Sequence, residues 1–342
     1  MKIAVIGLGS MGKRRVRDLL RLNCEIVGFD ISEKRARETQ EIYNIKFLPS
    51  FEKILDEKVQ AVVISTPPDI HFEYYKKCFK NKISFFSEAN IFCPNETWFL
   101  EQEKSSGVRA FPSATWRSHP IFHMSKEILE RNGMEKVNSV HYHYGGYLPL
   151  WHPYENYWDF YAGKRKTSAA REMVPWELEW LCFVFGKVES VHAIHGQFSK
   201  WKTDIDDSYF LHLKFESGLK GTLNIELHQT APFRIGRISC QNLALTLDLA
   251  KHEIQRYDLE TDSWKFLKMP GTKTLNSFNF EEIYFREMEN FHSALLGKNL
   301  YNKTWQEERH LSDILFAAEE SSKCGSWIKI DDIKNSYDGQ NW

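Results

Sequence analysis

The chain lacks the long apolar runs of a membrane protein. None of its uninterrupted hydrophobic stretches approaches the roughly 20 residues that a helix needs to cross a bilayer. It also lacks an excess of charge, since 45 Lys and Arg residues stand against 46 Asp and Glu residues. We therefore expect no general attraction to nucleic acid or to an anionic membrane, and the basic–aromatic interleaving of nucleic-acid-binding segments is absent.

Cysteine is present without any framework pattern. The six Cys residues are scattered, no two form a C-x-x-C pair, and several lie in apolar runs typical of small buried side chains. This usage favours a reducing cytoplasm over a disulfide-stabilised secreted protein. The first apolar strand begins at once after Met1 and leaves no room for a signal peptide, which also predicts a cytoplasmic location.

Local signatures of other chemistries are missing as well. No Ser-His-Asp or Cys-His arrangement is recognisable in the sequence. His141 and His143 are two apart on a predicted strand and share one face, but the spacing names no third metal ligand. We interpret this pair as part of an exposed sheet face or a subunit interface, and we predict no metal site.

The most informative feature that is present is the opening segment. An apolar strand runs into Gly7, Gly9 and Gly12, and a helical segment follows. In a dinucleotide-binding fingerprint, the first glycine allows the tight turn, the second lets the backbone approach the pyrophosphate, and the third lets the helix pack on the strand. The helix N-terminus, with Ser10 and Met11, then offers unpaired N–H groups to the phosphates.

An acidic residue stands where the ribose of such a cofactor should lie. Asp30 ends the second apolar run after the glycines. A carboxylate there accepts hydrogen bonds from the ribose hydroxyls and repels a 2′-phosphate, so NAD is favoured over NADP. Nearby Lys34, Arg35 and Arg37 soften this preference, and the alternative role of Asp30 is to cap the next helix.

The first 118 residues alternate strands with helices, which is typical of a doubly wound parallel sheet. The third strand ends at Thr66-Pro67-Pro68, where two prolines stop the strand and fix a turn. Ligands of such sheets lie beyond the carboxyl ends of the strands, so we expect Thr66, Pro67, His71, Glu88 and Asn90 at the cofactor cleft. Strands are predicted at 2–6, 24–29, 60–65, 83–87 and 109–113, with helices near 11–22, 32–43, 70–81 and 96–106.

After Trp116 the regular alternation of strands and helices ends. We therefore divide the chain into an NAD(P)-binding domain, 1–118, and a substrate and oligomerisation domain, 119–342. The second sheet is predicted to be large and mainly antiparallel. Aromatic residues make up 14% of the chain, and many of them could line a cleft for a sugar-like ligand, although most are expected in the core. Helices are predicted near 120–131, 171–185, 279–296 and 304–323, and strands near 136–147, 188–198, 207–216, 219–229, 234–240, 243–249 and 252–258.

Four segments occur in a recognisable order: Gly7-Leu-Gly-Ser-Met-Gly12, Ala61-Val-Val-Ile-Ser-Thr-Pro-Pro-Asp-Ile-His71, Trp116-Arg-Ser-His-Pro120 and Glu177-Leu-Glu-Trp-Leu-Cys-Phe-Val-Phe-Gly186. With them, the chain resembles the Gfo/Idh/MocA oxidoreductase family over essentially its whole length. The resemblance implies a Rossmann domain, a second domain with an open-faced antiparallel sheet, a nicotinamide cofactor, and carbohydrate or cyclitol chemistry. It also implies a homodimer or homotetramer built through the C-terminal sheet.

Two motifs of that family are altered here. The family usually carries Glu-Lys-Pro, whose lysine assists proton transfer, whereas this chain has Glu88-Ala89-Asn90. The family often carries Asp-x-x-x-His on a helix, and those positions hold Glu172 and Trp176, which share one helix face. The resemblance therefore implies the fold and the cofactor, but not the usual mechanism of hydride transfer.

A replacement acid or base needs a pKa within reach of neutrality. The aromatic loop after Tyr147, which relatives use to contact substrate, offers His152, with Glu172 holding it or the substrate hydroxyls. Tyr154 is the reserve proton donor, and the alternative for His152 is a loop histidine stacked among aromatic rings. Substrate-binding roles are further predicted for Arg117, His119, Lys166, Arg171 and Trp176.

Those further roles have structural alternatives. Arg117 and His119 precede a helix that they can cap, and Lys166 belongs to a charged run that is usually solvated. Arg171 adjoins Glu172 and can pair with it or fix an anionic substrate.

Three functions are compatible with these features. The first is an NAD-dependent oxidoreductase acting on a hydroxyl or keto group of a sugar or sugar derivative, which includes nucleotide-linked sugars. The second is an enzyme that retains NAD, oxidises a sugar transiently, and hydrolyses or epimerises it. The third is a non-catalytic regulator that binds a nucleotide or sugar.

Overall fold

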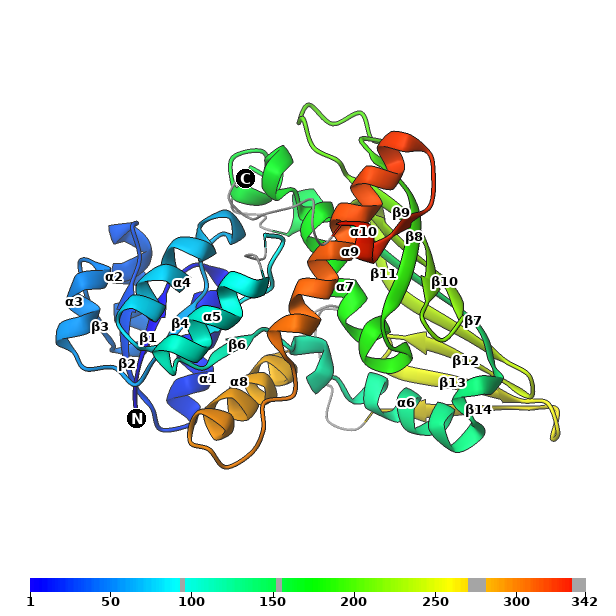
Figure 1. Cartoon of the computed structure of the whole chain (residues 1–342), viewed down its shortest axis with the longest axis horizontal. Coiled ribbons are helices and arrows are strands. Elements are labelled where there is room, and N and C mark those ends of the chain that lie inside the picture. Colours follow the sequence, from blue (N-terminus) through cyan, green and yellow to red (C-terminus); the bar gives the residue numbers. More distant parts are fainter. Residues whose placement is uncertain (93–95, 152–155, 270–280, 334–342) are drawn as a thin grey trace. The chain divides into compact units, whose positions relative to one another are not determined.

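The computed structural model describes residues 1–92, 96–151, 156–269 and 281–333, which divide into two compact units (Figure 1). Unit 1 contains Met1–Ser118 together with Glu281–Arg309, which we call the returning segment. Unit 2 contains the described residues of 119–269 and 310–333. The C-terminal domain predicted from the sequence, 119–342, included the returning segment, which the structure groups with unit 1 instead.

Unit 1 is built on a parallel sheet with the strand order β3-β2-β1-β4-β5-β6. Strand β4 is buried along its whole length, as expected for a strand covered on both faces. The order reverses between β1 and β4, which is the switch point where sheets of this type bind ligands. The strands are β1 (Lys2–Ile6), β2 (Glu25–Phe29), β3 (Lys46–Phe47), β4 (Ala61–Ile64), β5 (Ser84–Ser87) and β6 (Ala110–Pro112).

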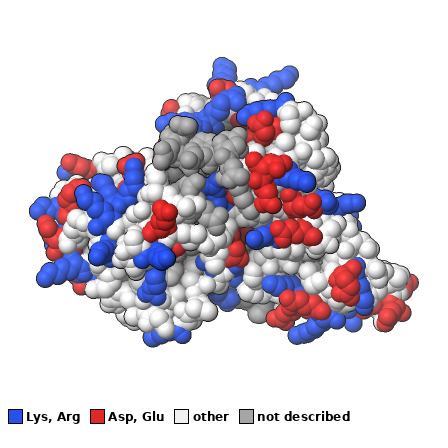
Figure 2. Space-filling model, viewed as in Figure 1, with Lys and Arg blue, Asp and Glu red and all other residues white. Residues whose placement is uncertain are grey.

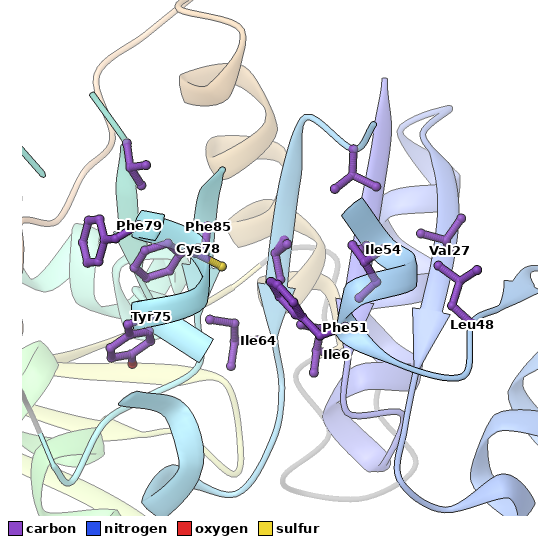
Figure 3. Packing of buried hydrophobic residues seen from close by; sticks show 14 of the residues in the cluster. Ile6, Val27, Leu48, Phe51, Ile54, Ile64, Tyr75, Cys78, Phe79 and Phe85 are labelled. Atoms are coloured by element: carbon purple, nitrogen blue, oxygen red, sulfur yellow. The ribbon is translucent and has the colours of Figure 1, made fainter. Parts of the chain in front are cut away.

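Helices cover both faces of this sheet, because successive strand side chains point to opposite sides. Ile6 and Ile64 pack with side chains of α3, α4 and α5, among them Phe51 and Tyr75 (Figure 3). Neighbouring strand residues such as Val5 pack instead with α1, α2 and α8. The helices are α1 (Ser10–Arg21), α2 (Glu33–Tyr43), α3 (Phe51–Asp56), α4 (His71–Lys80), α5 (Glu96–Ser106) and α8 (Glu281–Leu295), with the 3₁₀ turns η1 (Pro68–Ile70) and η2 (Thr115–Ser118).

Unit 2 contains a sheet with the order β14-β13-β12-β11-β7-β10-β9-β8-β15. Its pairs are antiparallel except β7 with β10, which run parallel. The predicted fold class, a parallel doubly wound sheet followed by a mainly antiparallel one, is confirmed. The strands are β7 (Val137–Tyr147), β8 (Val188–Gly196), β9 (Ser208–Phe215), β10 (Lys220–Glu226), β11 (His228–Cys240), β12 (Leu243–Asp248), β13 (Glu253–Asp258), β14 (Ser263–Lys268) and β15 (Ile328–Lys329).

Helices pack on one face of this second sheet (Figure 1). Tyr142 of β7 meets Trp180 of α7 with ring centroids 4.9 Å apart, and Phe215 of β9 meets Phe185 of α7 at 6.0 Å. The helices are α6 (Pro120–Asn132), α7 (Ala169–Phe185), α9 (Trp305–Cys324) and α10 (Ile330–Ile333), with short turns η3 (Met134–Lys136), η4 (Leu148–Leu150), η5 (Tyr161–Gly163) and η6 (Arg165–Thr167). The first five residues of α9, 305–309, belong to the returning segment of unit 1.

The opposite face of the second sheet, which we call the open face, carries partly or fully exposed side chains. They alternate with the buried ones, and His141, Thr222, His212 and His192 stand in one row across four adjacent strands. The structure thus places His141 on an exposed sheet face, as the sequence predicted. The open face comprises His141, His143, His192, Ile194, Phe210, His212, Thr222, Asn224 and Glu226.

Candidate cofactor and substrate sites

In the turn between β1 and α1, packing within the protein itself requires two of the glycines, Gly7 and Gly12. A Cβ on Gly7, whose φ is +83°, would lie 2.5 Å from Ser65 O, and one on Gly12 would lie 1.8 Å from Gly7 O. Gly9 differs, because a Cβ there would meet no protein atom within 4 Å. The space beside Gly9 is open, as required if the backbone is to approach a ligand closely.

The N-terminus of α1 lies directly behind this open space. No side chain caps the helix at Gly9, its first turn holds no acidic residue, and the Ser10 hydroxyl instead accepts a hydrogen bond from Arg14. Uncapped N–H groups and the positive end of the helix dipole together favour an anion. The turn therefore fits the pyrophosphate of a dinucleotide, with Ser10 and Met11 supplying N–H groups.

Asp30 lies at the carboxyl end of β2 and organises the neighbouring turns. Its carboxylate accepts the N–H groups of Leu8 and Ser32, each at 2.7 Å, and a two-point ion pair from Arg35 at 2.9 and 3.0 Å. Ser32, and not Asp30, caps α2, because the Ser32 hydroxyl accepts from the Arg35 N–H. The capping alternative for Asp30 is therefore not needed, and its carboxylate stands beside the glycine turn.

The residues after β4 form a buried polar cluster. His71 is 1% exposed, and its Nε2 lies 2.8 Å from Thr66 O while its Nδ1 lies 3.0 Å from Asn90 Oδ1. Burial lowers the pKa of His71, while its contacts with Asn90 and with Thr66 O oppose that shift. Asn90 Oδ1 also accepts from Tyr75 OH, and Pro67 precedes the η1 turn. His71 and Asn90 thus bond within the protein and hold the loops that follow β4 and β5.

Glu88, at the end of β5, is tied to α1. Arg15 is fully buried and donates to both Glu88 oxygens, at 2.6 and 2.7 Å, while its Nη1 lies 2.7 Å from Glu287 of the returning segment. The two carboxylates raise the pKa of Arg15, against the opposing effect of its burial, so the guanidinium remains charged. Glu287 further accepts from Ser113 Oγ, the Ala114 N–H and Thr115 Oγ1.

A second buried ion pair holds Asn90. Glu308 Oε1 accepts from both the N–H and the Nδ2 of Asn90, each at 2.9 Å. Glu308 Oε2 lies 2.6 Å from Lys303 Nζ, which also donates to Ser113 O at 2.7 Å. Sequence reasoning missed Arg15, Glu287, Lys303 and Glu308, because no motif or periodicity links them to the turns that they hold.

In unit 2, α7 is anchored by charged side chains on both sides of Glu172. Arg171 forms a two-point ion pair with Glu319, at 2.6 and 3.2 Å, and also donates to Lys166 O. Glu177 is fully buried and pairs with Arg234 at 2.9 Å. Burial raises the pKa of Glu177, and Arg234 opposes that shift.

Between these anchors, Glu172 and Trp176 remain partly exposed one turn apart on α7. Glu172 accepts a hydrogen bond from Tyr161 OH at 3.0 Å. The Lys166 side chain is exposed, while its carbonyl is held by Arg171. The arrangement can present a carboxylate, a phenol and an indole together to a polyhydroxylated ligand.

The remaining predicted residues take structural positions or lie outside the described residues. Arg117 is buried, contacts Asn302 O and pairs with Glu307 at 2.8 Å. His119 caps α6 by accepting the Ile121 N–H, which is the alternative role considered for it. The predicted acid–base residues, His152 and Tyr154, lie outside the described residues.

Two further properties concern the whole described chain. No His, Cys, Asp or Glu residues among those described gather in threes to hold a metal ion. Within the same residues, no helix has both the length and the apolar character needed to cross a membrane. Basic and acidic side chains are interspersed over the visible surface of each unit (Figure 2), in keeping with the balanced composition.

Family comparisons agree with this layout. Residues 1–93 match the model described as "Oxidoreductase family, NAD-binding Rossmann fold", and residues 122–241 match the GFO/IDH/MocA C-terminal domain. Unit 1 is therefore an NAD-binding Rossmann unit, which confirms the predicted cofactor class. No curated protein matches the sequence.

Solved structures of similar fold span nearly the whole chain. Levoglucosan dehydrogenase in complex with NADH and levoglucosan has a TM-score of 0.81 at 14% identity, over 96% of this chain and 99% of that one. An oxidoreductase from Agrobacterium radiobacter with NAD+, L-tartaric acid and magnesium has 0.82 at 13%, over 97% and 99%. UDP-N-acetylglucosamine 3-dehydrogenase from Acidithiobacillus ferrooxidans has 0.75 at 16%, over 95% and 98%. At these identities the similarity concerns the fold.

The different environments of the glycines give a testable contrast. We expect Gly9→Val to keep the melting temperature but to weaken NAD binding by at least about tenfold, because its side chain enters the open space beside α1. Gly12→Val should instead lower the melting temperature, since its Cβ collides with Gly7 O. Calorimetric titration and thermal unfolding of both variants measure this, and unchanged NAD binding in Gly9→Val would contradict the assignment.

Proposed function

This chain belongs to the Gfo/Idh/MocA oxidoreductase family, and on that premise we propose that it transfers a hydride between NAD and a carbon bearing a hydroxyl or keto group in a sugar or sugar derivative. The observation that carries the proposal is the open, uncapped turn at Gly9, with the Asp30 carboxylate beside it. Bound NAD would accept or supply the hydride. The protein's own residues must then hold the cofactor, orient the sugar and move one proton.

The cofactor residues divide into contacts and supports. Gly9, Ser10 and Met11 are the proposed contacts for the pyrophosphate, and Asp30 is the proposed contact for the adenosine ribose. Gly7 and Gly12 shape the turn. His71 and Asn90, predicted as cofactor contacts, are proposed here as supports, because their side-chain polar atoms bond within unit 1. Glu88, also predicted as a contact, is proposed as a support for the same reason, because Arg15 holds both of its carboxylate oxygens. Thr66 and Pro67 remain proposed contacts at the carboxyl end of β4.

The preference for NAD over NADP depends on the pair formed by Asp30 and Arg35. The carboxylate disfavours a 2′-phosphate, yet Arg35 neutralises part of its charge through two contacts. Arg35 is nearly half exposed, so it is able to turn toward a phosphate. We propose that Asp30 causes the preference for NAD over NADP and that Arg35 reduces this preference.

Substrate recognition is proposed for the exposed groups on α7. The Glu172 carboxylate, fixed by Tyr161, is suited to accept hydrogen bonds from sugar hydroxyls. The ring of Trp176 is suited to the apolar face of a pyranose. Arg171, Lys166, Arg117 and His119 were also predicted to bind substrate. We now propose Arg171 as a support for α7, since Glu319 holds its guanidinium.

The proton must come from or go to a group other than the family lysine, because residue 89 is alanine. We propose His152 as the acid or base, with Glu172 orienting it or the substrate and Tyr154 in reserve. A neutral imidazole accepts the hydroxyl proton during oxidation and returns it during reduction.

We further propose a homodimer or homotetramer that buries the open face of the second sheet. The row formed by His141, Thr222, His212 and His192 is exposed in the single chain. Rows of mixed polar and apolar side chains, such as Asn224, Phe210 and Ile194 beside it, suit a self-complementary two-fold contact.

Cofactor selectivity gives the first prediction from this proposal. We expect Asp30→Asn to lower the ratio of NAD to NADP affinity by about tenfold, because it removes the charge that repels the 2′-phosphate and releases Arg35. Arg35→Ala should raise the ratio. Arg37→Ala, which breaks only an exposed pair with Glu33, is the control. Equal ratios in all four proteins, measured by calorimetry, would exclude Asp30 as the selectivity residue.

The substrate role of Glu172 gives the second. Candidate sugars, beginning with levoglucosan and UDP-N-acetylglucosamine, are incubated with the protein and NAD, and turnover is measured as NADH absorbance. We expect the protein to turn over one class of sugar. Glu172→Gln should then lower kcat/KM by about 100-fold while NAD affinity stays unchanged. Tyr161→Phe, which removes one hydrogen bond to Glu172, should have a smaller effect in the same direction.

The same assay separates the two other functions. Product without net NADH would identify transient oxidation by retained NAD. Tight sugar binding without any product would identify a binding regulator. Wild-type protein that binds neither NAD nor NADP would contradict both enzymatic functions.

The proposed oligomer gives the third prediction. The chain mass is 40.3 kDa, so sedimentation should report a dimer or a tetramer of that unit. Thr222→Arg should dissociate it without changing the circular dichroism spectrum, because it buries an unpaired charge in the contact. Lys34→Glu, on an exposed helix of unit 1, is the control. A monomeric wild-type protein would rule out this assembly.

A further inference from the structure

The returning segment places two carboxylates inside unit 1. Glu287 is 1% exposed and Glu308 is 2% exposed, and each bonds to backbone or side chains that lie far away in the sequence. Apart from their ion-pair partners Arg15 and Lys303, these carboxylates bond to Asn90 after β5 and to Ser113–Thr115 after β6. One segment of chain thus holds two neighbouring turns at the same edge of the parallel sheet.

Asn90 is held at two points by one oxygen of Glu308. Its N–H and its Nδ2 both donate to Oε1 at 2.9 Å. The other Glu308 oxygen pairs with Lys303, which is 5% exposed and donates to Ser113 O, so the two turns are joined through one ion pair. A backbone N–H can make this bond only because residue 90 is not proline.

The position of these turns decides what they can affect. The strand order divides the sheet into a half with β1, β2 and β3, next to Asp30, and a half with β4, β5 and β6. In doubly wound sheets, each half receives one mononucleotide of a dinucleotide. The turns after β5 and β6 therefore belong to the half opposite to the adenosine side, which is the nicotinamide side.

We propose that Glu308, neutralised by Lys303, is a positioning residue that sets the Glu88–Asn90 turn for the nicotinamide half of the cofactor. The inference rests on the proposed NAD function and adds to it. Glu308 does not contact the cofactor; it fixes Asn90, and through it the neighbouring Ala89 and Glu88 that line the carboxyl end of β5. Glu287 holds Ser113–Thr115 and, through Arg15, Glu88.

Stability alone is a poor reason for this arrangement. A buried ion pair contributes little net stability compared with apolar side chains of similar size. The returning segment already packs through Met288 and Phe291 against buried apolar strand residues such as Val5 and Val63. At the opposite edge, Arg109 donates to Ala294 O and Leu295 O and ties the end of α8 without any buried carboxylate.

Two double variants test the proposal, because they differ only in whether Asn90 keeps an acceptor. Lys303→Met with Glu308→Gln removes both charges but keeps a carbonyl oxygen for Asn90. Lys303→Met with Glu308→Leu removes the charges and the acceptor. Calorimetric titration measures the Kd of each protein for NAD and for ADP-ribose, which lacks the nicotinamide ring.

We expect the Gln double variant to bind NAD within about threefold of the wild-type Kd. The Leu double variant should lose about tenfold in NAD affinity, as expected when buried donors lose their acceptor, but less than about twofold in ADP-ribose affinity. Arg109→Met is the control for simple loosening of the returning segment, and it should lower the melting temperature without changing the ratio of the two affinities.

Equal NAD affinity in the two double variants would overturn the proposal. So would a Leu double variant that loses NAD and ADP-ribose affinity by the same factor, because that result would indicate a purely structural role. Wild-type binding of NAD is measured first and tests the proposed function, so failure there is distinguishable from failure of the role assigned to Glu308.

Discussion

The close contact between the first strand and the first helix is the constraint on which unit 1 depends. Gly12 and Gly7 approach so nearly that any Cβ on Gly12 would overlap the Gly7 carbonyl, and Gly7 in turn abuts the backbone of Ser65. This contact sets the axis of α1 and aims its uncapped N–H groups past Gly9. The Leu8 N–H then bonds to the Asp30 carboxylate, so the glycine turn and Asp30 are held together.

Buried charge organises the rest of the same edge. Arg15 joins α1 to Glu88 and to the returning segment, and Glu308 joins Asn90 to Lys303. In a low-dielectric interior, such pairs are costly to separate and tolerant of only one geometry, which makes them effective at fixing loops. The apolar clusters on the two faces of the sheet stabilise unit 1. These charged groups instead hold the turns at the carboxyl ends of its strands.

Unit 2 uses the same principle on a helix. Arg171 forms an ion pair with Glu319, and Glu177 forms one with Arg234. Together these pairs fix the rotation of α7 about its axis. Glu172 and Trp176 are then left partly exposed on the intervening face. The Glu172 carboxylate therefore stands on a helix that is held by two ion pairs. The Trp176 indole adds a partly exposed apolar surface one turn further along the helix.

The sequence by itself determined the order of most strands and helices, because apolar periodicity and turn residues are local. Among the described elements, it missed β3, α3, β14, β15 and α10, and 3₁₀ turns such as η2 and η3. It also determined the turn of Gly7, Gly9 and Gly12 and the acidic residue Asp30 at the end of the second strand. Only the tertiary structure decided that Arg171 pairs with Glu319, that Arg15 joins Glu88 to Glu287, and that Glu308 holds Asn90. Those partners lie far apart along the chain, and a contact between distant residues leaves no spacing in the sequence, because only folding brings the two side chains together.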